Sequence, residues 1–153
     1  MSLNGGGEPL VEIEGVTKRY GGIVALDGVS ATVRERAVGQ AAASQAVGFT
    51  VKAPATLAGL PQHQVRAIGI GSHHAALATY GRGLGTVFLL EQRASGSKSP
   101  LSSLPSVSIA GSKGHELDTT LGSVIQWSRG GVTYTIAGSQ SAQRLLSAAE
   151  SLA

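Results

Sequence analysis

The sequence of 153 residues contains no cysteine. This absence excludes disulfide bonds, thiolate metal sites and cysteine nucleophiles together, but it does not decide the compartment. Charged residues make up 14% of the chain, against about 25% in an average soluble domain. Aromatic residues are also few, and the net charge of +3 comes from scattered Lys and Arg residues. Because nucleic-acid binding needs a clustered basic face, we expect no nucleic-acid partner.

Long apolar runs are missing as well. No stretch approaches the ~18 consecutive apolar residues of a transmembrane helix. The opening MSLNGGGEP has neither the basic region nor the apolar core of a signal peptide. We interpret residues 1–8 as a disordered leader or tag and leave the native compartment open. The remaining length is enough for one ordinary domain with a small additional element.

The first two thirds of the chain predict a hairpin, a helix and a meander. Residues 9–36 predict a β-rich hairpin in which Gly21-Gly22 separates two extended runs. Residues 38–47 are rich in alanine and predict a short helix, which Gly48 is placed to end. An antiparallel meander follows, with glycine-containing turns. Its three extended runs are residues 65–70, 75–80 and 86–92.

The C-terminal part predicts a loop, a hairpin and a helix. Residues 94–105 are rich in Ser, Gly and Pro and predict a mobile surface loop, and 106–109 predict a short strand. The tripeptide at 129–131, Arg-Gly-Gly, predicts the turn of a hairpin. Ser139 or Ser141 can cap a final helix. Its apolar residues share one helical face: Ala142, Leu145, Leu146, Ala149 and Leu152.

These elements predict an α+β fold. We expect an antiparallel sheet of about six strands, with an Ala-rich helix near 38–47 and a C-terminal helix packed on one face. The strand at residues 10–14 carries apolar side chains and an unpaired edge. We expect it to pair with this domain's own sheet or with a second copy of the chain in a homodimer.

The phrase VEIEGVTKRYGGIVALDGVSATV, residues 11–33, resembles the first strands of an ABC-transporter ATP-binding subunit. The resemblance implies that Tyr20 stacks on adenine. The family's phosphate-binding loop, G-x-x-x-x-G-K-[ST], should follow within about ten residues of Val33, but the chain runs RERAVGQAAASQ instead. We therefore interpret residues 9–36 as an ABC-like β segment without a P-loop, and we exclude ATP hydrolysis by this chain. The alternative for Tyr20 is a half-buried strand residue.

Residues 38–153 carry a second resemblance. ASQAVGFTVKAPATLAGLP, ALATYGRGLGTVFLLEQ and ELDTTLGSVIQWSRGGVTYTIAGS resemble the C-terminal region of actinobacterial LolA-like and MucB/RseB-like envelope proteins, and the related small domain called DUF4367. Such proteins are extracytoplasmic or membrane-anchored and carry a larger half-barrel domain that handles acyl chains or lipoproteins. The resemblance implies a non-catalytic α+β domain that binds a lipid, a lipoprotein or a protein partner.

Four aromatic residues are candidates for lining a ligand or partner groove in that domain: Phe49, Tyr80, Trp127 and Tyr134. The alternative for Trp127 and Tyr134 is a cross-strand pair in the core, on the two arms of the 129–131 hairpin. The alternative function, from the first resemblance, is a truncated or accessory ABC-transporter component, associated with a transporter and without ATPase activity of its own.

No residue pattern in the chain organises a catalytic site. A G-x-S-x-G elbow is absent. Adjacent His73 and His74 project to opposite faces of a strand, or lie exposed in a turn, and neither arrangement favours a shared metal. Glu91 and Glu116 are candidates for a carboxylate pair only because acids are scarce. The G-x-G-x-G spacing at 81–85 precedes a strand pattern and predicts a hairpin rather than a nucleotide loop. We predict no enzyme activity, no cofactor and no metal.

Overall fold

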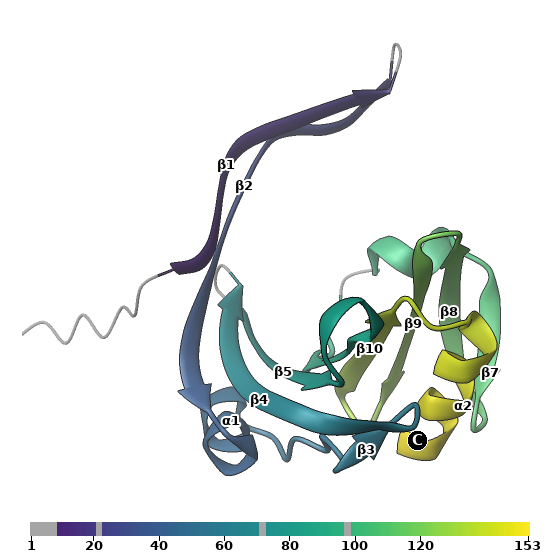
Figure 1. Cartoon of the computed structure of the whole chain (residues 1–153). Helices are drawn as coiled ribbons and strands as arrows, with labels where there is room; N and C mark the ends of the chain where they lie inside the picture. The colour runs from purple at the N-terminus through teal and green to yellow at the C-terminus, as the bar shows by residue number, and fades with distance from the viewer. Residues whose placement is uncertain (1–8, 21–22, 71–72, 97–98) are drawn as a thin grey trace, which may run out of the picture.

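The computed structural model describes residues 9–20, 23–70, 73–96 and 99–153 (Figure 1). In this part of the chain, ten strands form one antiparallel sheet in the order β1-β2-β4-β5-β6-β10-β9-β8-β7, with β3 paired to β4. The strands are β1 (Pro9–Tyr20), β2 (Ile23–Val38), β3 (Thr56–Leu57), β4 (Leu60–Ile70), β5 (His73–Tyr80), β6 (Val87–Arg93), β7 (Ser106–Ile109), β8 (Ser112–Thr119), β9 (Gly122–Arg129) and β10 (Val132–Gly138). The helices are α1 (Gln40–Val47) and α2 (Ala142–Leu152), with short 3-10 turns η1 (Gly83–Gly85) and η2 (Pro100–Ser103).

The α+β class is confirmed, but the sheet is larger than the six or so strands that the sequence predicts. The predicted meander is present as β4, β5 and β6, and the predicted hairpin around Gly130-Gly131 as β9 and β10. The 9–36 hairpin also joins the same sheet, because β2 continues to Val38 and pairs with β4. The short strand β3 and the whole of β8 were not predicted.

The sequence does not predict β8 because most of its residues are polar. Leu117 is its only large apolar residue, and this side chain is exposed. The strand forms because β7 and β9 hydrogen-bond to it on both sides. Gly114 lies opposite Trp127, and a Cβ at this position would lie 2.6 Å from Ile109 Cδ1 and 2.8 Å from the Gln126 carbonyl oxygen. Tertiary pairing, rather than alternation, makes this segment a strand.

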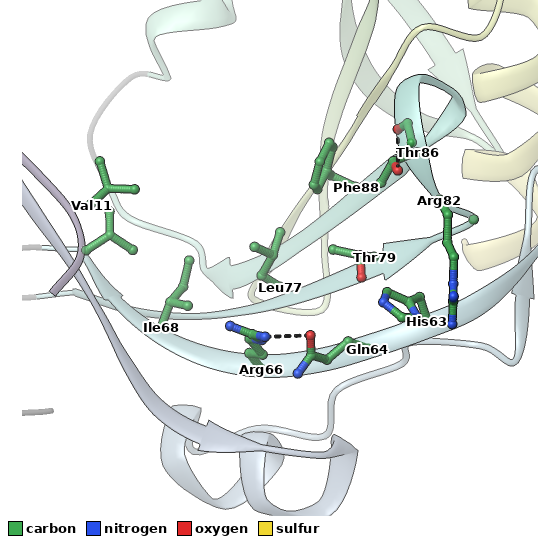
Figure 2. A pocket seen from close by; sticks show the side chains of 13 residues that line it. Val11, His63, Gln64, Arg66, Ile68, Leu77, Thr79, Arg82, Thr86 and Phe88 are labelled. Atoms are coloured by element: carbon green, nitrogen blue, oxygen red, sulfur yellow. Dashed lines mark hydrogen bonds between the residues drawn. The ribbon is translucent and has the colours of Figure 1, made fainter. Parts of the chain in front are cut away.

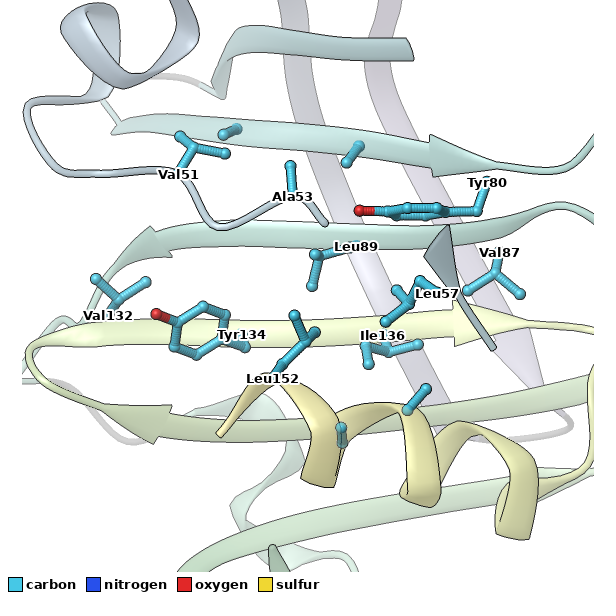
Figure 3. Close-up of a cluster of buried hydrophobic side chains, with 14 of the residues drawn as sticks. Val51, Ala53, Leu57, Tyr80, Val87, Leu89, Val132, Tyr134, Ile136 and Leu152 are labelled. Carbon is cyan, nitrogen blue, oxygen red and sulfur yellow. The ribbon is translucent and has the colours of Figure 1, made fainter. Parts of the chain in front are cut away.

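One face of the sheet carries the hydrophobic core (Figure 3). Directly opposite residues share a face: Ala78 pairs with Val65 and Leu89, and Leu89 pairs with Ile136. All four are buried. Both helices add residues to the same cluster, together with β3 and the segment that links α1 to it. These residues are Ala43, Val47, Val51, Ala53, Leu57, Leu145, Ala148, Ala149 and Leu152. The expected packing of two helices on one face is therefore observed.

Capping residues fix the C-terminal end of α1 and the N-terminal end of α2. Gly48 ends α1 in the left-handed conformation, with φ of 75°, as its position predicts. Ser141 caps α2, because its Oγ accepts a hydrogen bond from the Arg144 N–H at 3.4 Å. These ends position the two helices over the core face and leave the opposite face of the sheet without a helix among the described elements. We call this opposite side the open face.

β1 and the first part of β2 form a long arm that rises from the edge of the curved sheet (Figure 1). Only the part of β2 from Val33 to Val38 pairs with β4. β1 lies at the outer edge of the described sheet and has several register shifts. At one of them, Gly15 adopts a φ of 55° and its N–H donates to Ser30 Oγ at 2.9 Å. The base of the arm therefore forms a side wall beside the open face.

Two local predictions need correction or refinement. The sequence predicts His73 and His74 in a turn, but they are the first two residues of β5, and both are exposed. The intervening turn residues 71–72 lie outside the described residues. The predicted loop at 94–105 contains η2, which begins after Ser99, whose Oγ accepts from the Leu101 N–H at 3.1 Å. The mobility of this loop stays a prediction.

Candidate ligand-binding pocket

The open face contains a pocket with a volume of about 580 Å³ (Figure 2). Its walls come from β1, β2, β4, β5, the η1 turn and the start of β6. Strand side chains alternate between faces, so residues such as Arg66 and Ile68 of β4, Leu77 and Thr79 of β5 and Phe88 of β6 project away from the core and line this pocket. The curvature of the sheet and the base of the arm together make this surface concave.

Apolar side chains line one end of the pocket. They are Val11, Val33, Ile68, Leu77 and Phe88. Ile68 is buried, whereas Val11 is 49% exposed and Phe88 42% exposed. Large apolar side chains at such exposure, gathered around one hollow, form an apolar patch of the kind that often marks an interaction site. In Figure 2, Val11, Ile68 and Leu77 lie toward the arm side of the pocket, and Phe88 lies farther from Val11, beside Thr86.

Polar and basic side chains line the other end. His63, Thr79 and Arg82 lie beside the η1 turn, away from Val11 (Figure 2). Arg66 lies between the two ends, and its Nη2 donates to Gln64 Oε1 at 2.7 Å. Among the described lining residues none is Asp or Glu. The charged groups among the described lining residues are therefore the two arginines.

The η1 turn, which begins directly after Arg82, is held in place by its glycines and by a hydrogen bond. Gly81 and Gly83 have φ of 72° and 66°, a region that favours glycine. The Leu84 carbonyl accepts a hydrogen bond from Ser139 Oγ at 2.6 Å, which ties the turn to the chain after β10. The glycines thus form a hairpin connection between β5 and β6, as predicted, and this connection forms one rim of the pocket.

The four aromatic residues proposed from the sequence lie on the other side of the sheet. Tyr80, Trp127 and Tyr134 are 0%, 2% and 4% exposed and belong to the core, and Phe49 is half-buried against it. Trp127 and Tyr134 stack with ring centroids 5.2 Å apart, so the cross-strand pair is confirmed. None of the four lines the pocket on the open face. Their burial gives them a packing role in the described structure, and a ligand role for them stays a prediction.

Tyr20 ends β1 opposite Ile23. Its side chain lies outside the described residues, so the adenine-stacking role stays a prediction.

Glu91 is the buried carboxylate of the core, with 1% of its surface exposed. It accepts hydrogen bonds from the backbone N–H groups of Lys52, at 3.1 and 3.0 Å, and Ala53, at 3.0 Å. Burial raises the pKa of Glu91, while these N–H groups and the Lys52 charge lower it in part. The Lys52 ammonium lies 5.3 Å from the Tyr134 ring centroid and donates to the Leu152 carbonyl. The arrangement ties the 51–53 segment and the end of α2 to the sheet.

Glu91 and Glu116 do not meet. Their strands, β6 and β8, are separated by β10 and β9 in the sheet. Three strand spacings correspond to about 14 Å, beyond the ~5–9.5 Å that a glycosidase carboxylate pair spans. The described residues hold no cluster of three or more metal-ligating side chains. Neither α1 nor α2 has the length and hydropathy that a membrane-crossing helix needs.

The pocket residues were not selected from the sequence, although a signal exists. The β6 sequence VFLLEQR places apolar side chains on both faces: Val87 and Leu89 are buried in the core, and Phe88 faces the pocket. A strand with apolar side chains on both faces is usually packed against other groups on both faces. Here the core covers one side, and the pocket lies on the other.

Searches against protein-family models, curated proteins and solved structures found no match to this chain.

Proposed function

We propose that this chain is a non-catalytic binding domain, and that its open face holds the apolar part of a lipid-like ligand. The observation that carries the proposal is the pocket itself, with exposed Val11 and Phe88 around a hollow of about 580 Å³. Ligand pockets typically have volumes of about 300–1,000 Å³ and predominantly apolar walls. The LolA-like resemblance of residues 38–153 points to the same class of ligand.

The energetics favour an apolar occupant. Fully burying a side chain such as Phe contributes about 1.5–3 kcal/mol. Phe88 and Val11 are each close to half exposed, so covering both offers roughly 1–3 kcal/mol in total. This stabilisation is gained only when a ligand or partner covers the two side chains and removes them from water.

Binding without turnover fits the chemistry of the lining. The imidazole of His63 is the lining group best suited to act as a general base. No lining carboxylate is present to orient it, and the hydroxyl of Thr86 donates to the Gly83 carbonyl at 2.8 Å. The pocket therefore has groups that orient a ligand and lacks an organised nucleophile–base pair among its described residues.

The test is a calorimetric titration of the full chain with decyl maltoside, a neutral ten-carbon amphiphile, below its micelle concentration. We expect saturable binding that weakens roughly three- to tenfold in Phe88→Ala, since about half of a Phe burial is lost. The matched control is Leu121→Ala, which removes an apolar side chain that is 90% exposed and outside the pocket. Absence of binding, or equal weakening in both variants, would overturn the proposal.

A further inference from the structure

We infer that the ligand of the open face is a single-chain fatty-acid anion, bound in one orientation. Its carboxylate lies at the η1 end of the pocket beside Arg82 and His63, and its chain runs toward Val11 and Val33 at the base of the arm. This inference rests on the proposed function and adds the charge and the direction of the ligand.

Apolar and polar side chains are separated along the pocket. Figure 2 shows Val11, Ile68 and Leu77 toward the arm side, with His63 and Arg82 on the η1 side. Phe88 lies between them, opposite Thr79. An apolar ligand without a head group would leave the polar end unused. An amphiphile of the opposite direction would place its charged group against valine side chains, at a large desolvation cost.

The charged side chains that line the pocket are basic. Arg66 and Arg82 line the pocket, and no acidic residue is among its described walls. At the η1 end, Arg82 and His63 face the pocket and no described lining residue is acidic. A guanidinium recognises a carboxylate with two parallel hydrogen bonds, which favours an anionic head group over a cationic one.

Hydrogen bonds anchor the backbone at the η1 end of the pocket. Arg82 lies between Gly81 and Gly83, in a turn tied to the chain after β10 by the Ser139–Leu84 hydrogen bond of 2.6 Å. Thr86 closes the same turn by donating to the Gly83 carbonyl at 2.8 Å. A charge on an anchored turn loses less freedom when it binds an anion than a charge on an open loop does.

The base of the arm forms the end of the pocket where the ligand's alkyl chain would end. Val11 lies opposite Val33 in the β1–β2 register, and both line the pocket. Val33 is also the first β2 residue that pairs with β4, opposite Ile70. These two valines therefore stand where the arm leaves the sheet. They give the pocket an apolar end toward which successive methylene groups extend.

The experiment compares three ten-carbon probes by calorimetry on the full chain at low salt: decanoate, decyl maltoside and decyltrimethylammonium. We expect decanoate to bind at least tenfold more tightly than decyltrimethylammonium. Arg82→Gln should remove most of this preference. The matched control is Arg129→Gln, which makes the same charge change at an exposed residue outside the pocket. Added salt should reduce the preference, because screening weakens exposed charge pairs.

Orientation is tested with a chain-length series of octanoate, decanoate and dodecanoate. Each buried methylene contributes up to about a fourfold gain in affinity. Arg82→Gln should lower all three affinities by a similar factor and leave the gain per methylene unchanged. Val11→Thr, a change of similar size, should reduce the gain between decanoate and dodecanoate. The opposite assignment of effects would overturn the orientation.

The failures of the two proposals are distinguishable. Equal affinity for the three head groups, or an Arg82→Gln effect no larger than that of Arg129→Gln, would overturn the anionic ligand and leave the apolar pocket standing. If none of the three probes binds, the proposed function falls together with this inference.

Discussion

The N–H of Ala53 donates a 3.0 Å hydrogen bond to the buried Glu91 carboxylate, and this contact joins two parts of the chain that are 38 residues apart. Ala53 has a φ of 22°, a value that alanine rarely adopts. The segment from Val51 to Ala53 crosses the core between α1 and β3, where no neighbouring strand satisfies its N–H groups. The carboxylate supplies the acceptors that a strand would otherwise provide.

Replacing Glu91 by Ala is therefore expected to destabilise the fold strongly. The change orphans the N–H groups of Lys52 and Ala53 in the interior, at about 1–3 kcal/mol each. We expect a loss of about 2–5 kcal/mol in the free energy of unfolding, measured by urea denaturation. Glu116→Ala on β8, where the side chain is half-buried, is the control. A loss no larger than that of the control would contradict the assigned role of the carboxylate.

The same carboxylate predicts a pH dependence. Burial raises the Glu91 pKa above its ordinary value of 4.5, so the folded state keeps this proton to a higher pH than the unfolded state. Stability then falls as pH rises from about 4.5 through the raised pKa and levels off above it. We expect the difference in unfolding free energy between the wild type and Glu91→Gln to shift against the wild type over this window. A difference that is constant with pH would contradict the raised pKa.

Elements with local signals could be predicted from the sequence. Gly48 marks the end of α1 because only a glycine adopts its conformation easily. Gly130-Gly131 marks the β9–β10 turn for the same reason, and the pairing of Trp127 with Tyr134 follows from that register. Each of these features is specified by a few residues that are close together in the sequence.

Features made by distant residues could not be predicted. β8 exists because two neighbouring strands pair with it, and Glu91 is buried because Lys52 and Ala53 reach it from the other side of the core. The pocket combines β1 with residues more than 50 positions later. Its residues are ordinary strand and turn residues in the sequence, and only the curvature of the sheet brings them together.

Tyr80→Phe is expected to stabilise the protein slightly. The Tyr80 hydroxyl is buried and has no hydrogen-bond partner among the described residues, and burial raises its pKa to about 12. The nearby Gln62 amide lowers this pKa in part, but its N–H groups are directed to the carbonyls of Ala53 and Pro54. Removing an unpaired buried hydroxyl should raise the unfolding free energy by about 0.5–1 kcal/mol in urea denaturation. A loss above 1 kcal/mol would show that the hydroxyl has a partner.

Gly114→Ala is expected to destabilise the β7–β8–β9 end of the sheet. The added methyl would meet Ile109 Cδ1 at 2.6 Å and the Gln126 carbonyl oxygen at 2.8 Å, and the backbone oxygen cannot move without breaking the ladder. Overpacking of this kind costs about 1–3 kcal/mol. Ser112→Ala, two residues earlier on the same strand, is the control in thermal denaturation. Equal melting temperatures for the two variants would contradict the close packing.

The outer edge of β1 predicts self-association. Val11, Ile13 and Val16 are 49%, 39% and 39% exposed on a strand whose second edge is unpaired in the described sheet. Such an edge can pair with a second copy of the chain. We expect sedimentation velocity to show a concentration-dependent dimer that Ile13→Lys removes, because a charge on the edge opposes pairing. A monomer at all concentrations would rule out this homodimer.

Calorimetry with Mg-ATP tests the alternative that the arm is a nucleotide-binding remnant. Stacking on one aromatic residue contributes about 1–3 kcal/mol, whereas a Kd of 1 mM requires about 4 kcal/mol. The chain after Val33 has no P-loop to supply the difference. We therefore expect no saturable heat with ATP in a sample that binds decanoate. Saturable binding that Tyr20→Ala abolishes would instead place a nucleotide site on the arm and favour an accessory role beside an ABC transporter.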